Sequence, residues 1–150
     1  VNNFLIIPKQ FFTPEIIIKR KPLAETARRA GWIGCNIDIS KVAEAGRVFL
    51  VKQEKILNKS EVKDTFNKTL FLRDKGSEAK GWILDVLQSI DSINKNNFTL
   101  DEVYQFESKL KQKYPNNNFI KDKIRQQLQI LRDKGIIEFT SRGNYKKVIK

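Results

Sequence analysis

The chain has 150 residues, with 29 Lys and Arg against 17 Asp and Glu and a net charge of +12 at pH 7. This length allows one ordinary domain or two small ones, and the positive charge indicates a polyanionic partner, of which nucleic acid is the first to consider. A single cysteine, Cys35, and no histidine exclude an internal disulfide, a zinc site of Cys and His ligands, and Ser–His or Cys–His nucleophile pairs.

The sequence lacks the signals of a membrane or exported protein. No run approaches the roughly 20 apolar residues of a spanning helix, and the start does not resemble a signal peptide. We therefore expect a soluble, cytoplasmic protein without a membrane partner. The sequence contains no methionine, so Val1 is not a translation start and the chain is expected to be a fragment.

The first half of the chain predicts short strands that alternate with short helices, as in an α/β or α+β fold. Apolar runs at Asn3–Ile7 and Arg47–Val51 predict two strands, the first of them buried. Thr13 is expected to cap a short helix that ends in the basic stretch Lys19–Pro22. A further helix is expected to open at Ser60 and to pack Val62, Phe66 and Leu70.

The segment Arg28–Asn36 is the least generic part of the first half, and it leads into an apolar strand that reaches Ile39. It allows two interpretations. In the structural one, Trp32 belongs to the core and the arginines are surface charges. In the functional one, Arg28 and Arg29 contact phosphates, while the glycines let the backbone approach DNA so that Trp32 meets a base or its methyl group.

The charged, glycine-containing residues 73–80 are predicted to link two units, residues 1–72 and residues 81–150. The second unit opens with apolar residues at helical spacing from Trp82 to Ile90. This spacing predicts the first helix of that unit.

Two more helices are predicted in the second unit. Thr99 and Glu102 match a capping box, which begins a helix from about Asp101 to Lys113. Apolar residues from Ile120 to Leu131 then predict a third helix that stops at Gly135.

Strands complete the second unit. Ile136–Phe139 and Tyr145–Ile149 are predicted to pair through the loop Ser141–Asn144, and Phe98–Leu100 is predicted to be a short strand. Three helices followed by a β-hairpin is the order of a winged helix-turn-helix.

The third helix of this unit carries side chains suited to reading DNA. Gln and Arg make bidentate contacts to adenine and guanine in the major groove, and the N-terminal residues of a recognition helix contact base edges. The predicted DNA contacts are Asn116, Asn117, Asn118, Lys121, Lys123, Arg125, Gln126, Gln129, Arg142 and Lys146.

Two alternatives stay open at these residues. The asparagines from Asn116 to Asn118 could read bases or cap the helix that follows. Asp122 and Asp133 lie on the exposed face and would repel phosphate, which favours the N-terminal turn as the part that meets DNA. The second alternative is that the Lys and Arg side chains only keep the helix face soluble. That alternative leaves the basic residue at the wing tip, Arg142, unexplained.

No catalytic or metal-binding residue is predicted in this chain. Metal-dependent nucleases place an Asp and a Glu-x-Lys on adjacent strands, so that carboxylates hold Mg²⁺. Three Glu-x-Lys triplets occur, but they fall in predicted helices or the linker, and such matches arise by chance in a chain rich in Lys. They are Glu61–Lys63, Glu78–Lys80 and Glu107–Lys109.

Four segments carry a resemblance to a known family: Arg20–Leu23 (RKPL), Thr26–Ile37 (TARRAGWIGCNI), Leu70–Arg73 (LFLR) and Lys123–Lys134 (KIRQQLQILRDK). Together they resemble the DpnI family of methyl-directed restriction endonucleases over essentially the whole chain. Enzymes of that family cleave GATC sites with N6-methylated adenine and join a PD-(D/E)xK nuclease domain to a winged helix. The resemblance implies an α+β chain, in which a truncated α/β nuclease-domain remnant precedes a winged helix-turn-helix.

The resemblance also implies cofactors and a partner. Mg²⁺ for hydrolysis and a structural zinc would be held upstream of Val1 in the intact enzyme, so this chain is expected to bind neither and inherits no catalytic residue. The partner would be double-stranded DNA with adenine-methylated GATC. The functional interpretation of Trp32 gains support, because its segment would approach the methylated site, and we expect both units to prefer methylated adenine.

Functions of two other classes remain alternatives to a DNA-recognition part of an endonuclease. A non-enzymatic winged-helix regulator would have the same fold, since fold does not fix function. An RNA-associated protein fits the charge alone, although the major groove of A-form RNA is too narrow for a recognition helix.

Overall fold

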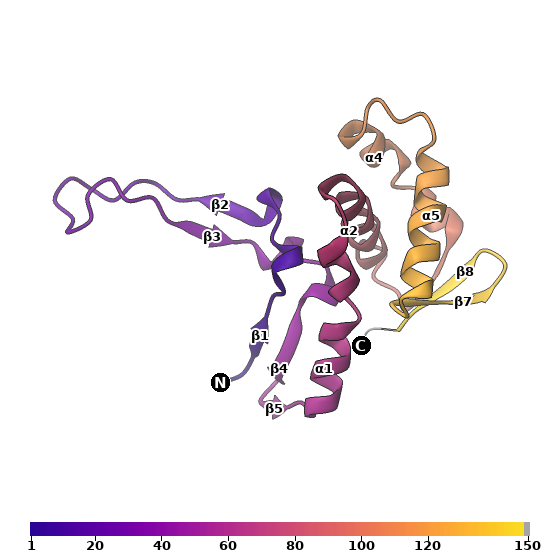
Figure 1. The fold of residues 1–150 in the computed structure, drawn as a ribbon, viewed down its shortest axis with the longest axis horizontal. Helices are drawn as coiled ribbons and strands as arrows, with labels where there is room; N and C mark the ends of the chain where they lie inside the picture. The colour runs from indigo at the N-terminus through magenta and orange to yellow at the C-terminus, as the bar shows by residue number, and fades with distance from the viewer. Residues whose placement is uncertain (149–150) are drawn as a thin grey trace.

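Short strands and helices segregate along the computed structural model, which describes residues 1–148 (Figure 1). This arrangement is an α+β fold, as predicted. No helix in these residues is long and apolar enough to cross a membrane. The elements in chain order are β1 (Phe4–Ile6), β2 (Ile17–Lys19), β3 (Cys35–Ile37), β4 (Val48–Lys52), β5 (Lys55–Ile56), α1 (Lys59–Asn67), α2 (Ser77–Ser92), β6 (Asn97–Thr99), α3 (Leu100–Tyr104), α4 (Glu107–Lys113), α5 (Ile120–Asp133), β7 (Ile137–Ser141) and β8 (Asn144–Lys147).

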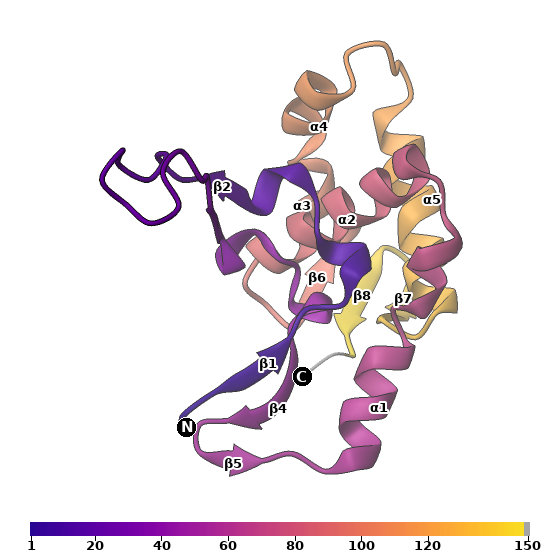
Figure 2. The same cartoon turned by 60° about the vertical axis from the view of Figure 1, so that its left-hand side comes forward.

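Three small antiparallel sheets organise the strands. One has the order β1-β4-β5, the second pairs β2 with β3, and the third has the order β6-β8-β7. Figure 2 shows the first sheet and α1 together at one end of the molecule, away from the helices of the second half. Helices α2 to α5 with the third sheet form the predicted winged helix-turn-helix order.

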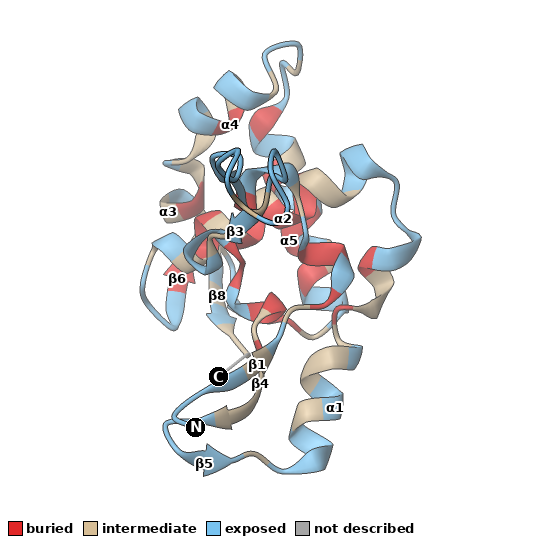
Figure 3. Ribbon diagram, turned by 90° about the vertical axis from the view of Figure 1, so that its left-hand side faces the viewer, coloured by how far each residue is buried: buried red, intermediate tan, exposed pale blue. Residues whose placement is uncertain are grey.

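The core is one hydrophobic cluster to which both halves of the chain contribute. Phe11, Ile16 and Leu72 from the first half belong to the same cluster as Trp82 and Val86 of α2. Figure 3 shows these buried segments gathered around α2 and α5. The Phe11 ring lies so close to Gly46 that a Cβ there would stand 2.5 Å from it, so this contact requires glycine.

Polar contacts also join the two halves. The carboxylate of Asp91 in α2 accepts a hydrogen bond of 2.9 Å from the backbone N–H of Glu44. Burial raises the pKa of Asp91 to about 6. The Lys113 ammonium lies 2.8 Å from Asp85 and also pairs with Glu15 of the first half.

Several predictions for the first half need correction. The strand predicted at Asn3–Ile7 exists as β1, but it is largely exposed, because it forms one edge of a sheet. Thr13 precedes a 3₁₀ turn without a side-chain cap. The chain then enters strand β2 instead of ending a helix at Lys19–Pro22. Helix α1 begins at Lys59, one residue before the predicted start, and is capped by Asn58, whose side chain accepts from the Ser60 N–H.

The predicted linker is also too long. Arg73 and Asp74 finish a 3₁₀ turn and α2 already begins at Ser77. Residues 73–80 therefore belong mostly to the end of that 3₁₀ turn and to the start of α2. Only Lys75 and Gly76 lie between the two elements.

In the second half, the capping box of Thr99 and Glu102 is confirmed. The helix predicted from Asp101 to Lys113 is instead two helices, α3 and α4, separated at Gln105 and Phe106. The hairpin turn is shorter than predicted, with only Arg142 and Gly143 between the strands. Ile149, the predicted end of the last strand, lies outside the described residues.

Candidate nucleic-acid interface

Helix α5 is held on the molecule by one strongly apolar face. Ile120, Ile124, Leu128 and Leu131 are buried at helical spacing, and Gly135, with φ of +72°, follows the helix in a conformation that suits glycine. Lys123 extends over the Trp82 ring, 6.0 Å from its centre. Packing against α2 therefore fixes which face of α5 meets solvent.

The turn before α5 is held by its own side chains. The Asn117 carboxamide oxygen accepts a hydrogen bond of 2.7 Å from the Phe119 N–H. Lys111 of α4 donates to the Asn117 carbonyl at 2.6 Å and to the Asn118 side chain at 3.1 Å. Of the two interpretations of the asparagines, the local structural one fits Asn117, while Asn116 forms no side-chain hydrogen bond within residues 1–148.

The solvent face of α5 includes three polar side chains that have no partner among residues 1–148. Arg125, Gln126 and Gln129 are exposed, and none of them forms a side-chain hydrogen bond or ion pair within the described chain. Lys121 is also exposed but lies 3.8 Å from Glu107. Arg125, Gln126 and Gln129 are therefore available to an external ligand. Lys123 is less accessible to such a ligand because it is half-buried.

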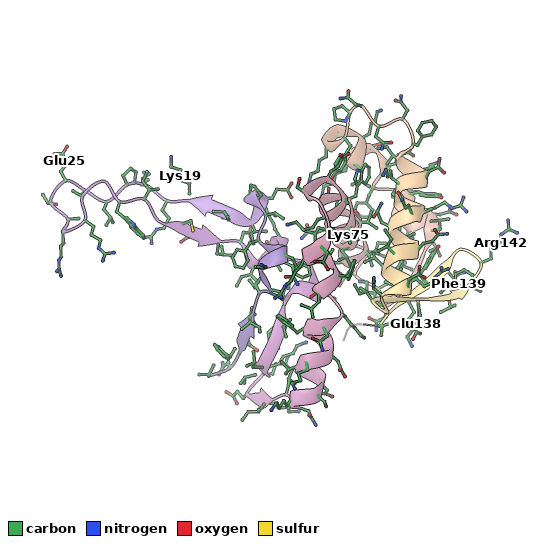
Figure 4. All side chains as sticks on the ribbon, in the orientation of Figure 1. Lys19, Glu25, Lys75, Glu138, Phe139 and Arg142 are labelled. Atoms are coloured by element: carbon green, nitrogen blue, oxygen red, sulfur yellow. The ribbon has the colours of Figure 1, made fainter. Side chains whose placement is uncertain are left out.

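The wing places Arg142 at its tip. Gly143 has φ of +73°, and the Asn144 amide donates to the Ser141 hydroxyl and the Arg142 carbonyl, which closes the turn. Figure 4 shows the Arg142 side chain projecting from the hairpin. Lys146 lies on β8, in register with Glu138 of β7.

Residues 20–34, the arm, continue the β2–β3 pair as a long exposed ribbon (Figure 1). Backbone hydrogen bonds from Arg20 to Gly34 and from Leu23 to Trp32, of 2.9 and 3.0 Å, hold its two sides together. Gly31 turns the chain with φ of +76°. Arg28 and Arg29 are exposed near this turn.

Trp32 does not belong to the core, so the structural interpretation of this residue is wrong. Its side chain is 53% exposed, because the arm projects away from the packed helices and offers no apolar surface beyond itself. The indole lies against Gly34, where a Cβ would stand 2.9 Å from its ring. The ring is thus supported on one side and open to solvent on the other.

The predicted contacts form two groups that lie far apart. Those of α5, the turn before it and the wing share one side of the molecule, whereas the arm extends from the other side (Figure 1). Glu25 in the arm and Arg142 in the wing mark opposite ends of the molecule (Figure 4).

The structure adds one aromatic residue that the sequence reasoning missed. Phe119 stands at the N-cap of α5 and is 70% exposed. It directly precedes Ile120, the first residue of the buried apolar face. The signal was its place one residue before that face, since each helical step turns the side chain by about 100°.

Two family models match the chain. The model described as the Dam-replacing family (DpnI) matches residues 1–75, and the model described as the Dam-replacing HTH domain matches residues 78–147.

Proposed function

Because this chain belongs to the Dam-replacing family and carries its helix-turn-helix domain, we propose that it is the DNA-recognition part of a methyl-directed restriction endonuclease. The observation that supports this most is the free polar face of α5. Arg125, Gln126 and Gln129 have the donors and acceptors that read adenine and guanine, and Arg142 stands at the tip of the wing (Figure 4). The proposed target is GATC with N6-methyladenine in double-stranded DNA.

The arm is the second proposed reader. Arg28 and Arg29 carry positive charge without an ion-pair partner among residues 1–148, which suits contact with phosphates. The exposed face of Trp32 offers an apolar plane for a methylated base. An apolar contact distinguishes one methyl group by only about 1 to 3 kcal/mol, so two readers in one chain would multiply a modest preference.

Hydrolysis by the intact enzyme would require Mg²⁺, and the resemblance also implies a structural zinc. The residues of this chain do not fit either role. No three His, Cys, Asp or Glu side chains among residues 1–148 are grouped to hold a metal ion. The three Glu-x-Lys triplets lie on helices α1, α2 and α4 and not on adjacent strands, so we propose both metals only for the intact enzyme.

The test is a titration of the chain with matched duplexes that carry GATC with and without N6-methyladenine, over a range of salt concentrations. A preference of about tenfold, roughly 1.4 kcal/mol, for the methylated duplex would support the proposal. Equal affinities with a steep salt dependence would contradict it, because phosphate contacts alone would then explain binding.

The same titration with two variants separates the readers. Gln126→Ala combined with Gln129→Ala removes amides from α5, and Trp32→Ala removes the indole from the arm. If both units read the methylated site, each variant lowers the preference in part. A preference that survives both changes would exclude these residues as its source.

A further inference from the structure

Phe119 has an unusual combination of exposure and order. Phe119 is more exposed than Phe4, Phe12 and Phe139. It takes part in none of the aromatic pairs or cation–π contacts of the described chain, whereas the Phe139 ring meets Tyr145 edge-on. Single exposed apolar residues are common on protein surfaces, so exposure alone does not indicate a binding role for Phe119.

The backbone of Phe119 is fixed on both sides. Its N–H donates to the Asn117 side chain at 2.7 Å, and its carbonyl accepts from the Lys123 N–H at 3.0 Å. Ile120, the next residue, is buried and anchors the first turn of α5. The ring is therefore carried by a backbone that these contacts hold in place.

Phe119 lies at a position where contact with a methyl group of a DNA base is expected. The N-terminal residues of a recognition helix approach base edges in the major groove. The thymine methyl group and the N6 position of adenine both face that groove, and Phe is among the side chains that contact the thymine methyl. Asn116 and Asn118 precede Phe119 in the same turn and are exposed. The Asn116 amide forms no side-chain hydrogen bond within residues 1–148 and could meet the polar edge of a neighbouring base.

We propose that Phe119 is a specificity-determining residue that contacts a base methyl group in the major groove. The contacted group belongs either to thymine or to N6-methyladenine, both of which occur in a methylated GATC site. This inference rests on the proposed function, because it places the Phe119 turn in the major groove.

The experiment uses the full chain and four duplexes. GATC carries adenine or N6-methyladenine, combined with thymine or with deoxyuridine, which lacks the 5-methyl group. We expect the wild-type chain to lose about tenfold in affinity when the contacted methyl group is removed. The Phe119→Ala variant should lose less than about twofold for the same change, and Phe119→Leu should keep part of the wild-type ratio.

Phe4→Ala is the matched control, since Phe4 is also exposed but lies on β1, and it should keep the wild-type ratios. Unchanged thermal unfolding of Phe119→Ala would exclude a folding defect. A wild-type ratio in Phe119→Ala for both methyl groups would overturn this inference. If that variant still prefers N6-methyladenine, the proposed function stands. If the wild-type chain binds all four duplexes equally, both fail.

Discussion

The arm and helix α5 bring their candidate contacts to the surface in different ways. The arm is a two-stranded ribbon whose residues are nearly all exposed, and main-chain hydrogen bonds hold it. Helix α5 buries Ile124, Leu128 and Leu131 almost completely. Isolated two-stranded hairpins are marginally stable in water, so the arm can adjust to a ligand while α5 presents a fixed surface.

The difference predicts which positions control folding and which control binding. The core beneath α5 fixes the direction of each recognition side chain on that helix, so the contribution of such a side chain to DNA affinity depends on packing. An arm residue acts through its own contacts. Substitutions in the two regions should therefore separate the free energy of unfolding from the affinity for DNA.

The largest expected effect is on stability, from Leu128→Ala. This change removes a buried side chain from the face of α5 that packs on α2, and it should lower the free energy of unfolding by about 3 kcal/mol. Urea unfolding measures the effect. Trp32→Ala is the comparison, because its indole is half-exposed and the change should alter that free energy by less than about 0.5 kcal/mol. Similar losses for both would contradict the contrast between the regions.

A smaller effect is expected from the arm arginines. If Arg28 and Arg29 each neutralise one phosphate, replacing both with Ala should reduce the slope of log K against log salt by about 1.8, and Arg142→Ala should reduce it by about 0.9. Affinity measured across salt concentrations gives both slopes. An unchanged slope for the double variant would mean that the arm does not touch the DNA backbone.

The smallest expected effect is on how the stability of the fold depends on pH. The pKa of Asp91 is raised by burial to about 6 in the folded chain, above its ordinary value of 3.8. The folded state therefore binds more protons in this window, and stability falls as the pH rises from about 4 through about 6. Asp91→Asn keeps an acceptor for the Glu44 N–H and removes the buried charge.

We expect Asp91→Asn to raise the melting temperature near pH 7.5 and to change it little near pH 4, with both measured by circular dichroism. A gain that is equal at both pH values would show that the charge is not its cause.

Sequence periodicity predicted the second half of the fold well. The buried positions of α2 and α5 and the capping box at Thr99 all have local signals. It missed the break at Gln105 and Phe106, because Val103, Phe106 and Leu110 keep helical spacing across it. It also missed the start of α2 at Ser77, because Gly76 is typical of a linker and the first regularly spaced apolar residue is Trp82.

The first half was harder to predict for a physical reason. Arm residues are exposed, so no burial pattern distinguishes Trp32 as a core residue from Trp32 as a ligand contact. The candidate contacts on α5 follow from amphipathicity, whereas the exposure of Phe119 depends on the turn that Asn117 and Lys111 build. That turn relies on contacts of Lys111 in α4 with the segment before α5, whereas the local pattern shows only that Phe119 precedes the buried face by one residue.

The shared core constrains how such a chain can be divided or recombined. The two family models meet between residues 75 and 78, yet Phe11 and Leu72 belong to one cluster with Trp82. Cutting the chain at that junction would expose apolar surface of both pieces to water. An exchange of either piece between relatives would need a complementary surface on its new neighbour, so we expect the two segments to be inherited together.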